Sequence, residues 1–487
     1  MPQLSEKDRD GEDRDVGSLN SHESDIETLS GPGLKRQLKN RHIAMISIGG
    51  VIGTGLFLGT ASPLRNGGPL GLLLGYMVVG SMCYSTMICV GEMIAYLPIA
   101  GGPIKLAERF VNRSFSFTLG WNYWYNWAMG LPAELSAASI LMNFWNKSVS
   151  SAVWITVFYI VVLIINLFGA GLYGECEFYF ASIKVLTITG LIILGIVLDL
   201  GGGPDHDRIG FRFWKNPGPF VQADKIPGAT GRFLGWWLVM SQAAFSFIGT
   251  EAVALAAGEA RNPHALAISG NAPKVLGYTT KRGLPLFTVL ASSSLGLLAY
   301  MATSSGSGRV FGWFVNMTAI AGLMGWFGIS FTYLRFYAGL KAQGISRDTL
   351  PYKAPFQPYA AWYTLISTLV VCFFSGVSVF LKGHWATDTF VTNYLPFVLF
   401  PILYFGARHL LYKEPMIAPQ DMDFVSGLDK VAEDTYDEKP PRNCFEKFWQ
   451  WLSHAMIFIA NLIHNTLSKA ESYEDSVKYS PISRGIN

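Results

Sequence analysis

Charge is scarce in this sequence. Only 15% of the 487 residues are Asp, Glu, Lys or Arg, whereas soluble domains usually carry about 25%. Half of the residues are hydrophobic, and the charged ones are clustered, so that long stretches contain few of them. Because a membrane-spanning helix needs about 20 mainly apolar residues, this pattern argues against a soluble enzyme with buried helices. It predicts an all-α polytopic membrane protein.

Cysteine is scarce too, and the usual motifs of enzymes are missing. The five cysteines are scattered, with neither metal-ligand nor disulfide spacing; they are Cys83, Cys89, Cys176, Cys372 and Cys444. The sequence has no phosphate-binding glycine loop, no metal-ligand cluster and no convincing nucleophile triad. The stretch GGGPDHDR at 201–208 contains His and Asp, but its place in a loop favours a turn over a set of ligands. We therefore expect no metal, no cofactor, no nucleic-acid partner and no enzymatic activity.

Ten stretches are long and apolar enough to be predicted as membrane spans. Their approximate bounds are 43–62, 70–97, 117–145, 152–170, 178–200, 233–257, 285–304, 310–338, 360–381 and 390–411. They predict a transmembrane domain over residues 34–412. Residues 1–33 are rich in Ser, Asp and Glu, which predicts a disordered N-terminal tail. Residues 413–487 are expected to form a C-terminal tail.

Lys and Arg are unevenly distributed between the loops. They gather before the first predicted span and after the second, sixth and eighth, at Lys35, Arg36, Lys39, Arg41, Lys105, Arg109, Arg113, Arg261, Lys274, Lys281, Arg282, Arg335, Lys341, Arg347 and Lys353. The alternate short loops carry fewer, namely Arg65, Lys147, Arg309 and Lys382. The positive-inside rule therefore predicts that both termini lie in the cytoplasm and that the long loop 201–232 lies outside.

Glycine is placed where a membrane helix tolerates it poorly. The stretch GGVIGTGLF at 49–57 puts four glycines into the first span, and each costs about 1 kcal/mol of helix stability relative to alanine. Its triplet Ile52-Gly53-Thr54 recurs as Ile248-Gly249-Thr250 in the sixth span. Secondary transporters bind substrates at such paired helix breaks, because irregular backbone is tolerated in a membrane only where it faces protein or a cavity. The alternative is that these glycines serve close helix packing.

Three charged residues lie inside predicted spans, where ionisable groups are costly and suggest a function. They are Glu134 in the third span, Lys184 in the fifth and Glu251 directly after the second Ile-Gly-Thr. A desolvated amine near carboxylates or carbonyls can exchange protons. Each could instead be part of a structural ion pair, and Lys184 is close enough to the predicted start of its span to snorkel. Glu92, nearer a cytoplasmic end, favours a structural role.

Several longer motifs carry a family resemblance. They are LKNRHIAMISIGGVIGTGLFLG (38–59), GEMIAYLP (91–98), GWNYWYNW (120–127), LPAELSA (131–137), FSFIGTE (245–251), GEARNP (258–263), GNAPK (270–274) and LPYKAPFQPY (350–359). With them the chain resembles the fungal amino-acid permeases of the amino acid–polyamine–organocation superfamily, of the yeast amino acid transporter type. The resemblance implies a core of five plus five helices in inverted repeat with two extra helices, and proton-driven uptake of amino acids across the plasma membrane.

The resemblance also implies a binding site at the two breaks. The carboxylate of the amino acid would meet the backbone at Gly53, Thr54 and Gly55, and its amino group would meet backbone carbonyls of both breaks. The expected substrate-binding residues are Ile52, Gly53, Thr54, Gly55, Phe245, Ser246, Phe247, Gly249 and Thr250. Lys184 matches the family's lysine of the fifth span, whose protonation is thought to replace a sodium ion. Glu251 and Glu134 are further candidates for proton coupling.

The chain departs from the family pattern in two places. GEARNP is followed almost at once by HALAISGNAPK, so spans seven and eight of the family are expected to be missing near 263–266. A transport-deficient relative, acting as a sensor or regulator or arising as an altered gene product, is therefore the alternative to a transporter. Beyond the usual family end, the stretch 445–467 predicts either an amphipathic helix on the membrane surface or read-through sequence. The sequence leaves the preferred amino acids and the oligomeric state open.

Overall fold

The computed structural model describes residues 52–97, 99, 101–167, 170–223, 226–251, 278 and 285–426, without the side chains of 170–178. The chain divides into two units, Met1–Val431 and Ala432–Asn487, and every described residue belongs to the first. All regular elements within the described ranges are helical, which confirms the all-α prediction. The predicted tail 1–33, the expected deletion near 263–266 and the stretch 445–467 lie outside the described residues.

The first two predicted spans meet at a sharp turn. α3 comprises Thr54–Phe57 and α4 comprises Ala61–Tyr96, but α4 is interrupted at Gly68. The backbone there has φ 76° and ψ 175°, a conformation that glycine adopts without strain. Leu70 N donates a hydrogen bond of 3.0 Å to Pro219 O, and Val221 N donates one of 3.3 Å to Gly67 O. The loop before α10 thus closes over the turn between the two spans.

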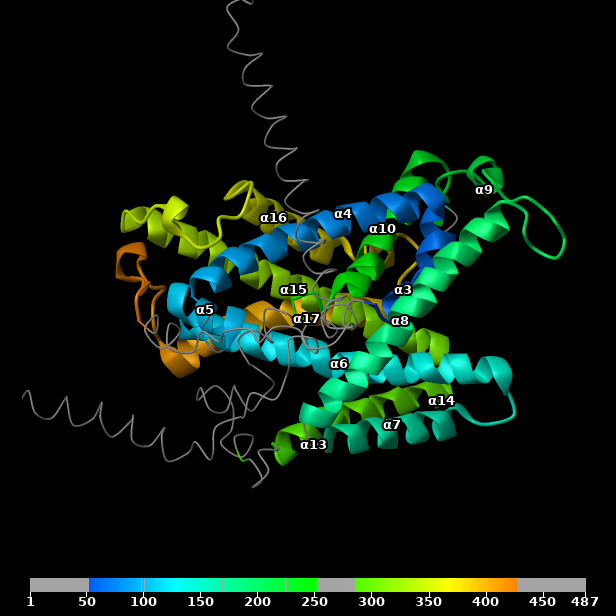
Figure 1. Ribbon diagram of the computed structural model, residues 1–487, viewed down its shortest axis with the longest axis horizontal. Coiled ribbons are helices and arrows are strands. Elements are labelled where there is room, and N and C mark those ends of the chain that lie inside the picture. Colours follow the sequence, from blue (N-terminus) through cyan, green and yellow to red (C-terminus); the bar gives the residue numbers. More distant parts are fainter. Residues whose placement is uncertain are drawn as a thin grey trace, which may run out of the picture. The chain divides into compact units, whose positions relative to one another are not determined.

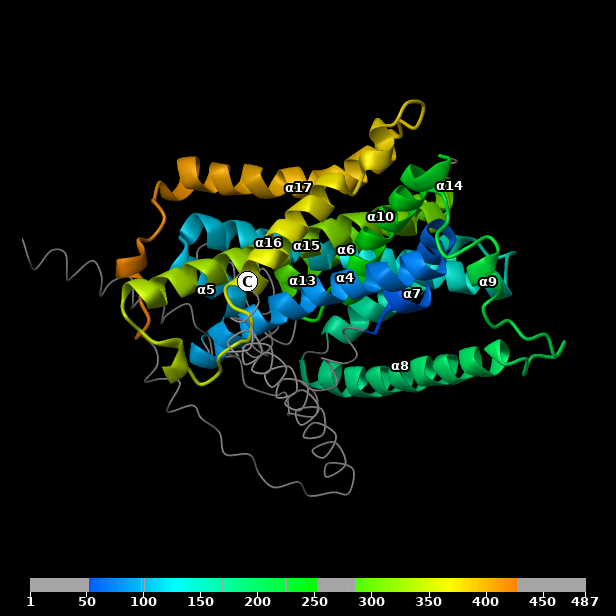
Figure 2. The same ribbon diagram turned by 90° about the horizontal axis from the view of Figure 1, so that it is seen from above.

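Helices of the next three predicted spans follow (Figure 1). They are α6 (Arg113–Trp145), α7 (Ser151–Leu167) and α8 (Ala170–Asp199); the shorter α5 (Gly102–Phe110) precedes them, between the second and third predicted spans, and the short α9 (Arg212–Lys215) follows. The Asn112 side chain accepts a hydrogen bond from Phe115 N at the start of α6, which satisfies one of its free N–H groups. α8 begins eight residues earlier than the predicted edge of 178, and Figure 2 shows it running along one side of the unit.

The second half of the unit begins with α10 (Gly228–Phe247). After the undescribed segment come α13 (Leu286–Ser294), η4 (Leu295–Met301), α14 (Ala302–Ser305), α15 (Ser307–Ala342), η5 (Arg347–Thr349), α16 (Tyr359–Phe374), η6 (Val377–Phe380), α17 (Thr387–Gly406), the π-helical η7 (Ala407–Tyr412) and η8 (Pro419–Asp421). Each of the later nine predicted spans therefore contains a helical segment. Within the described residues, five helices are long and apolar enough to cross a membrane.

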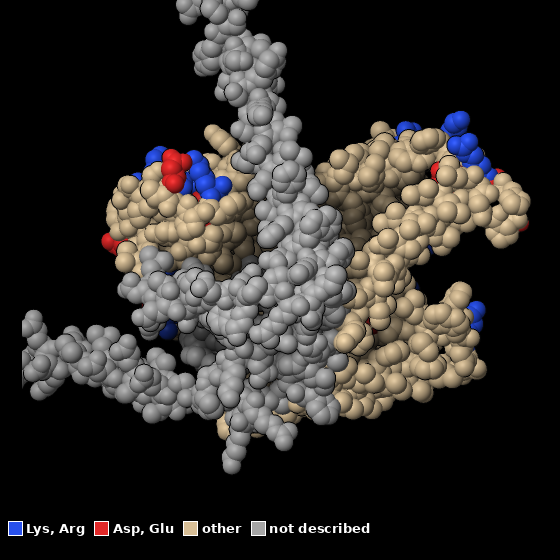
Figure 3. All heavy atoms as spheres, in the orientation of Figure 1, with Lys and Arg blue, Asp and Glu red and all other residues tan. Residues whose placement is uncertain are grey.

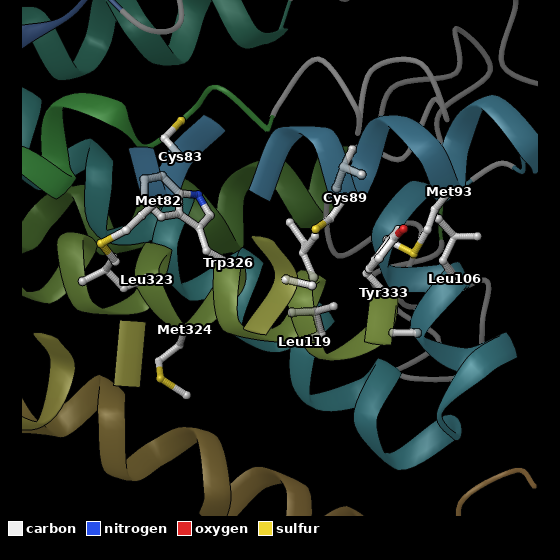
Figure 4. Packing of buried hydrophobic residues seen from close by; sticks show 14 of the residues in the cluster. Met82, Cys83, Cys89, Met93, Leu106, Leu119, Leu323, Met324, Trp326 and Tyr333 are labelled. Carbon is white, nitrogen blue, oxygen red and sulfur yellow. The ribbon is translucent and has the colours of Figure 1, made fainter. Parts of the chain in front are cut away.

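The core forms around α15, which packs against α4, α6, α10, α16 and α17. Its side chains Trp326, Tyr333 and Phe336 are fully buried, and Figure 4 shows Trp326 and Tyr333 beside residues of α4 and α6. The α4–α10 contact depends on glycine, since a Cβ at Gly67 or Gly75 would come within 2.6 or 2.5 Å of the Val239 methyl groups. Small residues at such spacing let membrane helices approach closely.

Glu92 connects several elements at one end of the core through hydrogen bonds, which agrees with the structural role expected for it. The side chain is fully buried and receives two hydrogen bonds of 2.7 Å from Arg347. Tyr333 Oη and Ala354 N each donate a further bond of 2.9 Å to Glu92 Oε2. Because both carboxylate oxygens are bonded, the charge is compensated. Glu92 thereby joins α4, α15 and the loop that precedes α16.

The chain after the last helix turns back across the same end. Ile417 N donates a hydrogen bond of 2.9 Å to Val111 O, and the Arg335 guanidinium donates to Ile417 O. Met422 and Phe424 are buried at 3% and 1% exposure. We call residues 415–426 the C-terminal strap. Its apolar side chains and its backbone hydrogen bonds fasten it to α5 and α15.

Candidate functional site

The sixth predicted span is interrupted where the sequence indicated. α10 ends at Phe247, and the next residue, Ile248, has extended backbone with φ −65° and ψ 136°. Gly249 follows with φ 105°, a left-handed conformation that favours glycine. Ile248 then packs against α15, since a Cβ at Gly322 would come within 2.4 Å of Ile248 Cδ1. The predicted break is thus confirmed, and its glycine is required by the backbone.

The first span carries the matching irregularity. Gly53 caps α3 with extended backbone, φ −140° and ψ −166°, which any residue can adopt. The N–H groups at the start of α3, including those of Thr54 and Gly55, have no acceptor within the helix. Among the described residues, apart from the chain neighbours of Gly53, no heavy atom lies within 4 Å of the place where a Gly53 Cβ would stand. Gly53 therefore borders open space, and the backbone there can be approached.

The two breaks lie against each other. A Cβ at Gly55 would come within 2.8 Å of Ser246 Cα and 3.2 Å of Phe245 Cδ1. The Ser246 hydroxyl, which would also lie 2.8 Å from that Cβ, forms a hydrogen bond of 2.9 Å with Tyr76 Oη. The Tyr76 ring also packs on Phe247, with centroids 5.9 Å apart. The absence of a side chain at Gly55 is what permits the close contact between α3 and α10.

Two of the predicted charges are brought to the first break. Thr54 Oγ1 donates a hydrogen bond of 2.7 Å to Glu134 Oε1. Glu134 is exposed although it lies well inside α6, so its carboxylate faces open space. The half-buried Lys184 lies close enough for its charge to act on Glu134. α8 begins at Ala170, so Lys184 lies well inside the helix. It is nevertheless within two turns of the start of the apolar stretch Tyr179–Asp199.

The third predicted charge lies at the second break. Glu251 is 1% exposed, and its Oε2 accepts hydrogen bonds from Gly249 N at 3.2 Å, Thr250 Oγ1 at 3.3 Å and Trp326 Nε1 at 3.3 Å. Within the described part of the chain, Glu251 Oε1 is buried without a hydrogen-bond partner. Cys83 Sγ lies 3.2 Å from Thr250 Oγ1. The polar groups of the second break are therefore enclosed by α4 and α15.

The predicted site residues thus separate into two groups. Thr54 and Glu134 are joined at the first break, where the charge of Lys184 also acts, whereas Glu251 is buried at the second. The sequence analysis did not identify three residues whose side chains contact polar groups at the second break, namely Tyr76, Cys83 and Trp326. They are apolar or weakly polar residues within spans, and neither spacing nor charge marks them. The described residues contain no group of His, Cys, Asp and Glu that could hold a metal ion.

Comparison with known proteins gives one consistent result. The sequence model of the family described as "Amino acid permease" matches residues 42–265 and 264–413. The proline-specific permease of Emericella nidulans is 33% identical, and the match covers 86% of this chain and 93% of that protein. The lysine-specific permease of Saccharomyces cerevisiae is 31% identical over 88% of this chain and 85% of that protein. The proline-specific permease of the same yeast is 32% identical over 85% of this chain and 82% of that protein.

The two matched segments meet at residues 264–265, beside the place where two spans are expected to be missing. The match to the Emericella protein runs over 516 residues, more than the 487 of the whole chain, so it includes gaps on the side of this chain. This segment lies outside the described residues. The loss of two spans stays a prediction.

Proposed function

Because the chain belongs to the amino acid permease family, we propose that it takes up amino acids across the plasma membrane together with protons, with both termini in the cytoplasm. It is a multi-pass membrane protein of amino acid transport, and its family consists of transporters rather than enzymes. The observation that carries the proposal is the open space beside Gly53, at the contact between two broken helices. Paired breaks of this kind bind substrates in secondary transporters.

The substrate carboxylate binds the backbone N–H groups from Gly53 to Gly55. Three features support this assignment: the first N–H groups of α3 lack intrahelical acceptors, the backbone at Gly53 is extended, and no side chain of the described residues lies within 4 Å of a Gly53 Cβ. The amino group binds carbonyls at the end of α10, where the last carbonyls of a helix lack intrahelical donors. The Phe245 and Ser246 carbonyls are the candidates, because Phe247 O already accepts hydrogen bonds from Thr250 N and Oγ1. Ser246 and Phe245 form the wall between the two sets of backbone groups.

Lys184 carries the coupling proton in this proposal. The support is electrostatic, since the charge of Lys184 acts on Glu134 and Glu134 accepts a hydrogen bond from Thr54 at the first break. A proton arriving at Lys184 would therefore change the electrostatic field where the substrate carboxylate binds. Glu251 is the second candidate, because its buried Oε1 can accept a proton without losing a hydrogen bond to a described residue.

The alternative function is a transport-deficient relative that acts as a sensor or regulator. It is motivated by the two family spans expected to be missing near 263–266. The freed backbone groups of both breaks need neighbouring helices, since each group left unpaired in hydrocarbon costs several kcal/mol. We therefore expect the chain as written to transport poorly.

Uptake of radiolabelled amino acids tests both alternatives. Cells lacking their own amino-acid permeases express either this 487-residue chain or a version with spans seven and eight restored from a relative. Uptake by the restored version alone, inhibited by a protonophore, is the expected result. Full uptake by the original chain at equal surface expression would show that the two spans are dispensable. No uptake by either version, with a full panel of amino acids, would contradict the proposal of a transporter.

A further inference from the structure

The carbonyl of Ser246 is left without its helical partner where α10 ends. In a continuing α-helix this carbonyl would accept a hydrogen bond from the N–H group four residues later, that of Thr250. Thr250 N donates instead to Phe247 O, at 3.4 Å. Among the described residues, the Ser246 carbonyl thus lacks the donor that a continuing helix would supply. It stands at the end of α10, where the helix dipole gives the carbonyls a partial negative charge.

The side chain of the same residue is held by another helix. Ser246 is 5% exposed, and its hydroxyl forms a hydrogen bond of 2.9 Å with Tyr76 Oη on α4. A serine hydroxyl in a helix often bonds back to an earlier carbonyl of its own helix, whereas this one is bonded across to a neighbour. The hydrogen bond therefore restrains the last turn of α10, which carries the Ser246 carbonyl.

The Tyr76 ring is itself fixed by packing. It lies against the Phe247 ring, with centroids 5.9 Å apart. A Cβ at Gly80, one turn further along α4, would come within 3.3 Å of Phe247 Cζ. The Phe247 ring therefore lies over the face of α4 that Tyr76 and Gly80 share. The Tyr76 hydroxyl thus reaches Ser246 from a ring whose position is restrained on its other side.

The surroundings of this contact are apolar. The adjacent turns of the two helices bury Val79 and Ala243 completely, and Figure 3 shows the Lys, Arg, Asp and Glu side chains of the visible face mainly towards its two ends. In apolar surroundings a hydrogen bond is stronger than in water, and a hydroxyl without a partner is costly. Tyr76 and Ser246 therefore depend on each other for this bond.

We infer that Tyr76 is a positioning residue, which makes the binding site selective for an α-amino group. By holding Ser246 on α4, it keeps the Ser246 carbonyl directed at the ammonium group of the ligand. The positive charge of an ammonium is favoured at the carbonyl end of a helix, and an oxygen atom in its place brings no such charge. This role of Tyr76 rests on the proposed function, since it concerns the amino group bound at the end of α10.

Equilibrium binding measures this selectivity. The full 487-residue chain and the version with spans seven and eight restored are purified, and each of the twenty radiolabelled L-amino acids serves as a probe. The amino acid bound most tightly is then compared with the analogue that carries oxygen in place of its α-amino nitrogen. In Tyr76→Phe, the Kd of the amino acid should rise about fivefold, the usual value of one neutral hydrogen bond. The Kd of the oxygen analogue should stay unchanged.

Two further variants serve as controls. Ser246→Ala should have the same effect as Tyr76→Phe, and the double variant should lose no more than either single one, because both changes remove one interaction. Tyr363→Phe is the matched control. It removes another tyrosine–serine hydrogen bond of α4, of 2.7 Å to Ser81 Oγ, at the contact with α16, and it should leave both Kd values unchanged.

The ratio of the two Kd values distinguishes positioning from support of the fold. If Tyr76 only stabilised the helices, both ligands would lose affinity equally. An unchanged ratio in Tyr76→Phe, whether both Kd values stay the same or rise together, would overturn the inference and leave the proposed function intact. Binding of no amino acid by either version would contradict the proposed function and, with it, this role of Tyr76.

Discussion

Gly55 lies so close to Ser246 that a Cβ on Gly55 would approach the Ser246 Cα to 2.8 Å. Real Cβ atoms do not come so near, so the contact exists only because Gly55 has no side chain. Gly53, two residues earlier, faces open space instead. The two glycines of one motif therefore differ: Gly55 lets the broken helices meet, and Gly53 is where we propose that a ligand reaches the backbone.

Gly53→Leu should abolish substrate binding while the protein still folds and inserts. The extended backbone at Gly53 accepts any residue, and the leucine side chain would occupy the space proposed for the substrate carboxylate. The measurement is uptake per molecule at the cell surface, in a version with spans seven and eight restored. Gly55→Leu is the matched control and should instead lower surface expression, because its side chain collides with Ser246. Normal uptake by well-expressed Gly53→Leu would refute the proposed carboxylate site.

Lys184→Ala should make uptake independent of the pH gradient, if Lys184 carries the proton. The charge that acts on Glu134 and, through it, on Thr54 is then gone. Uptake of labelled substrate at several external pH values, again in the helix-complete version, gives the readout. Lys184→Arg keeps the charge but does not release the proton, so it should bind substrate without pH-driven accumulation. If pH dependence persists in Lys184→Ala, the coupling residue is Glu251 or Glu134, and Glu251→Gln becomes the decisive variant.

Arg347→Ala should destabilise the protein by about 3–5 kcal/mol, the usual cost of leaving a buried charge without its partner. Glu92 is fully buried, and Arg347 supplies two of its four hydrogen bonds. The apparent unfolding temperature of the detergent-solubilised protein provides the measurement. Lys353→Ala is the control from the same loop. It breaks an exposed pair with Asp348, which is worth at most about 1 kcal/mol, so equal shifts for both variants would contradict the structural role of Glu92.

Docking of the C-terminal strap on α5 and α15 should weaken only at acid pH. Burial raises the pKa of Asp423, but hydrogen bonds from Ser426 and Val425 N–H and from the Ser426 and Arg109 side chains outweigh it, and the net pKa lies well below the usual 3.8. Because the pKa of Asp423 is lower in the folded protein than in the unfolded chain, its charged carboxylate stabilises the docked strap at every pH above the unfolded pKa. This stabilisation is lost as the pH falls through the folded pKa.

Hydrogen exchange of residues 415–426 measures this docking. Between about pH 5 and pH 8, once the intrinsic pH dependence of exchange is corrected, protection of the strap should stay constant. Asp423→Asn should lower protection throughout that range, since the carboxylate and its ion pair with Arg109, 2.9 Å long, are then absent. A loss of protection near neutral pH in the unmodified chain would show that another group controls the strap.

The span positions and the two breaks could be predicted because they depend on local sequence. A run of apolar residues is stable in lipid wherever its neighbours lie, and Gly249 has φ 105°, which few other residues tolerate. The later nine predicted spans each contain a helix for this reason. The charged residues near the breaks could also be identified from the sequence, because charged residues inside a span are rare and costly.

Only the tertiary structure decided which of these groups meet. Thr54 and Glu134 are 80 positions apart, and Trp326 and Glu251 are 75 apart. The local sequence does not predict that the Thr54 hydroxyl contacts the exposed carboxylate of Glu134. Nor does it predict that the Trp326 indole contacts the buried carboxylate of Glu251. Those contacts depend on how α3, α6, α10 and α15 pack together, and packing is set by shape and volume summed over many side chains. The sequence alone therefore determined where the helices break, and the packed helices determined that Thr54 and Glu134 face open space while Glu251 is closed off.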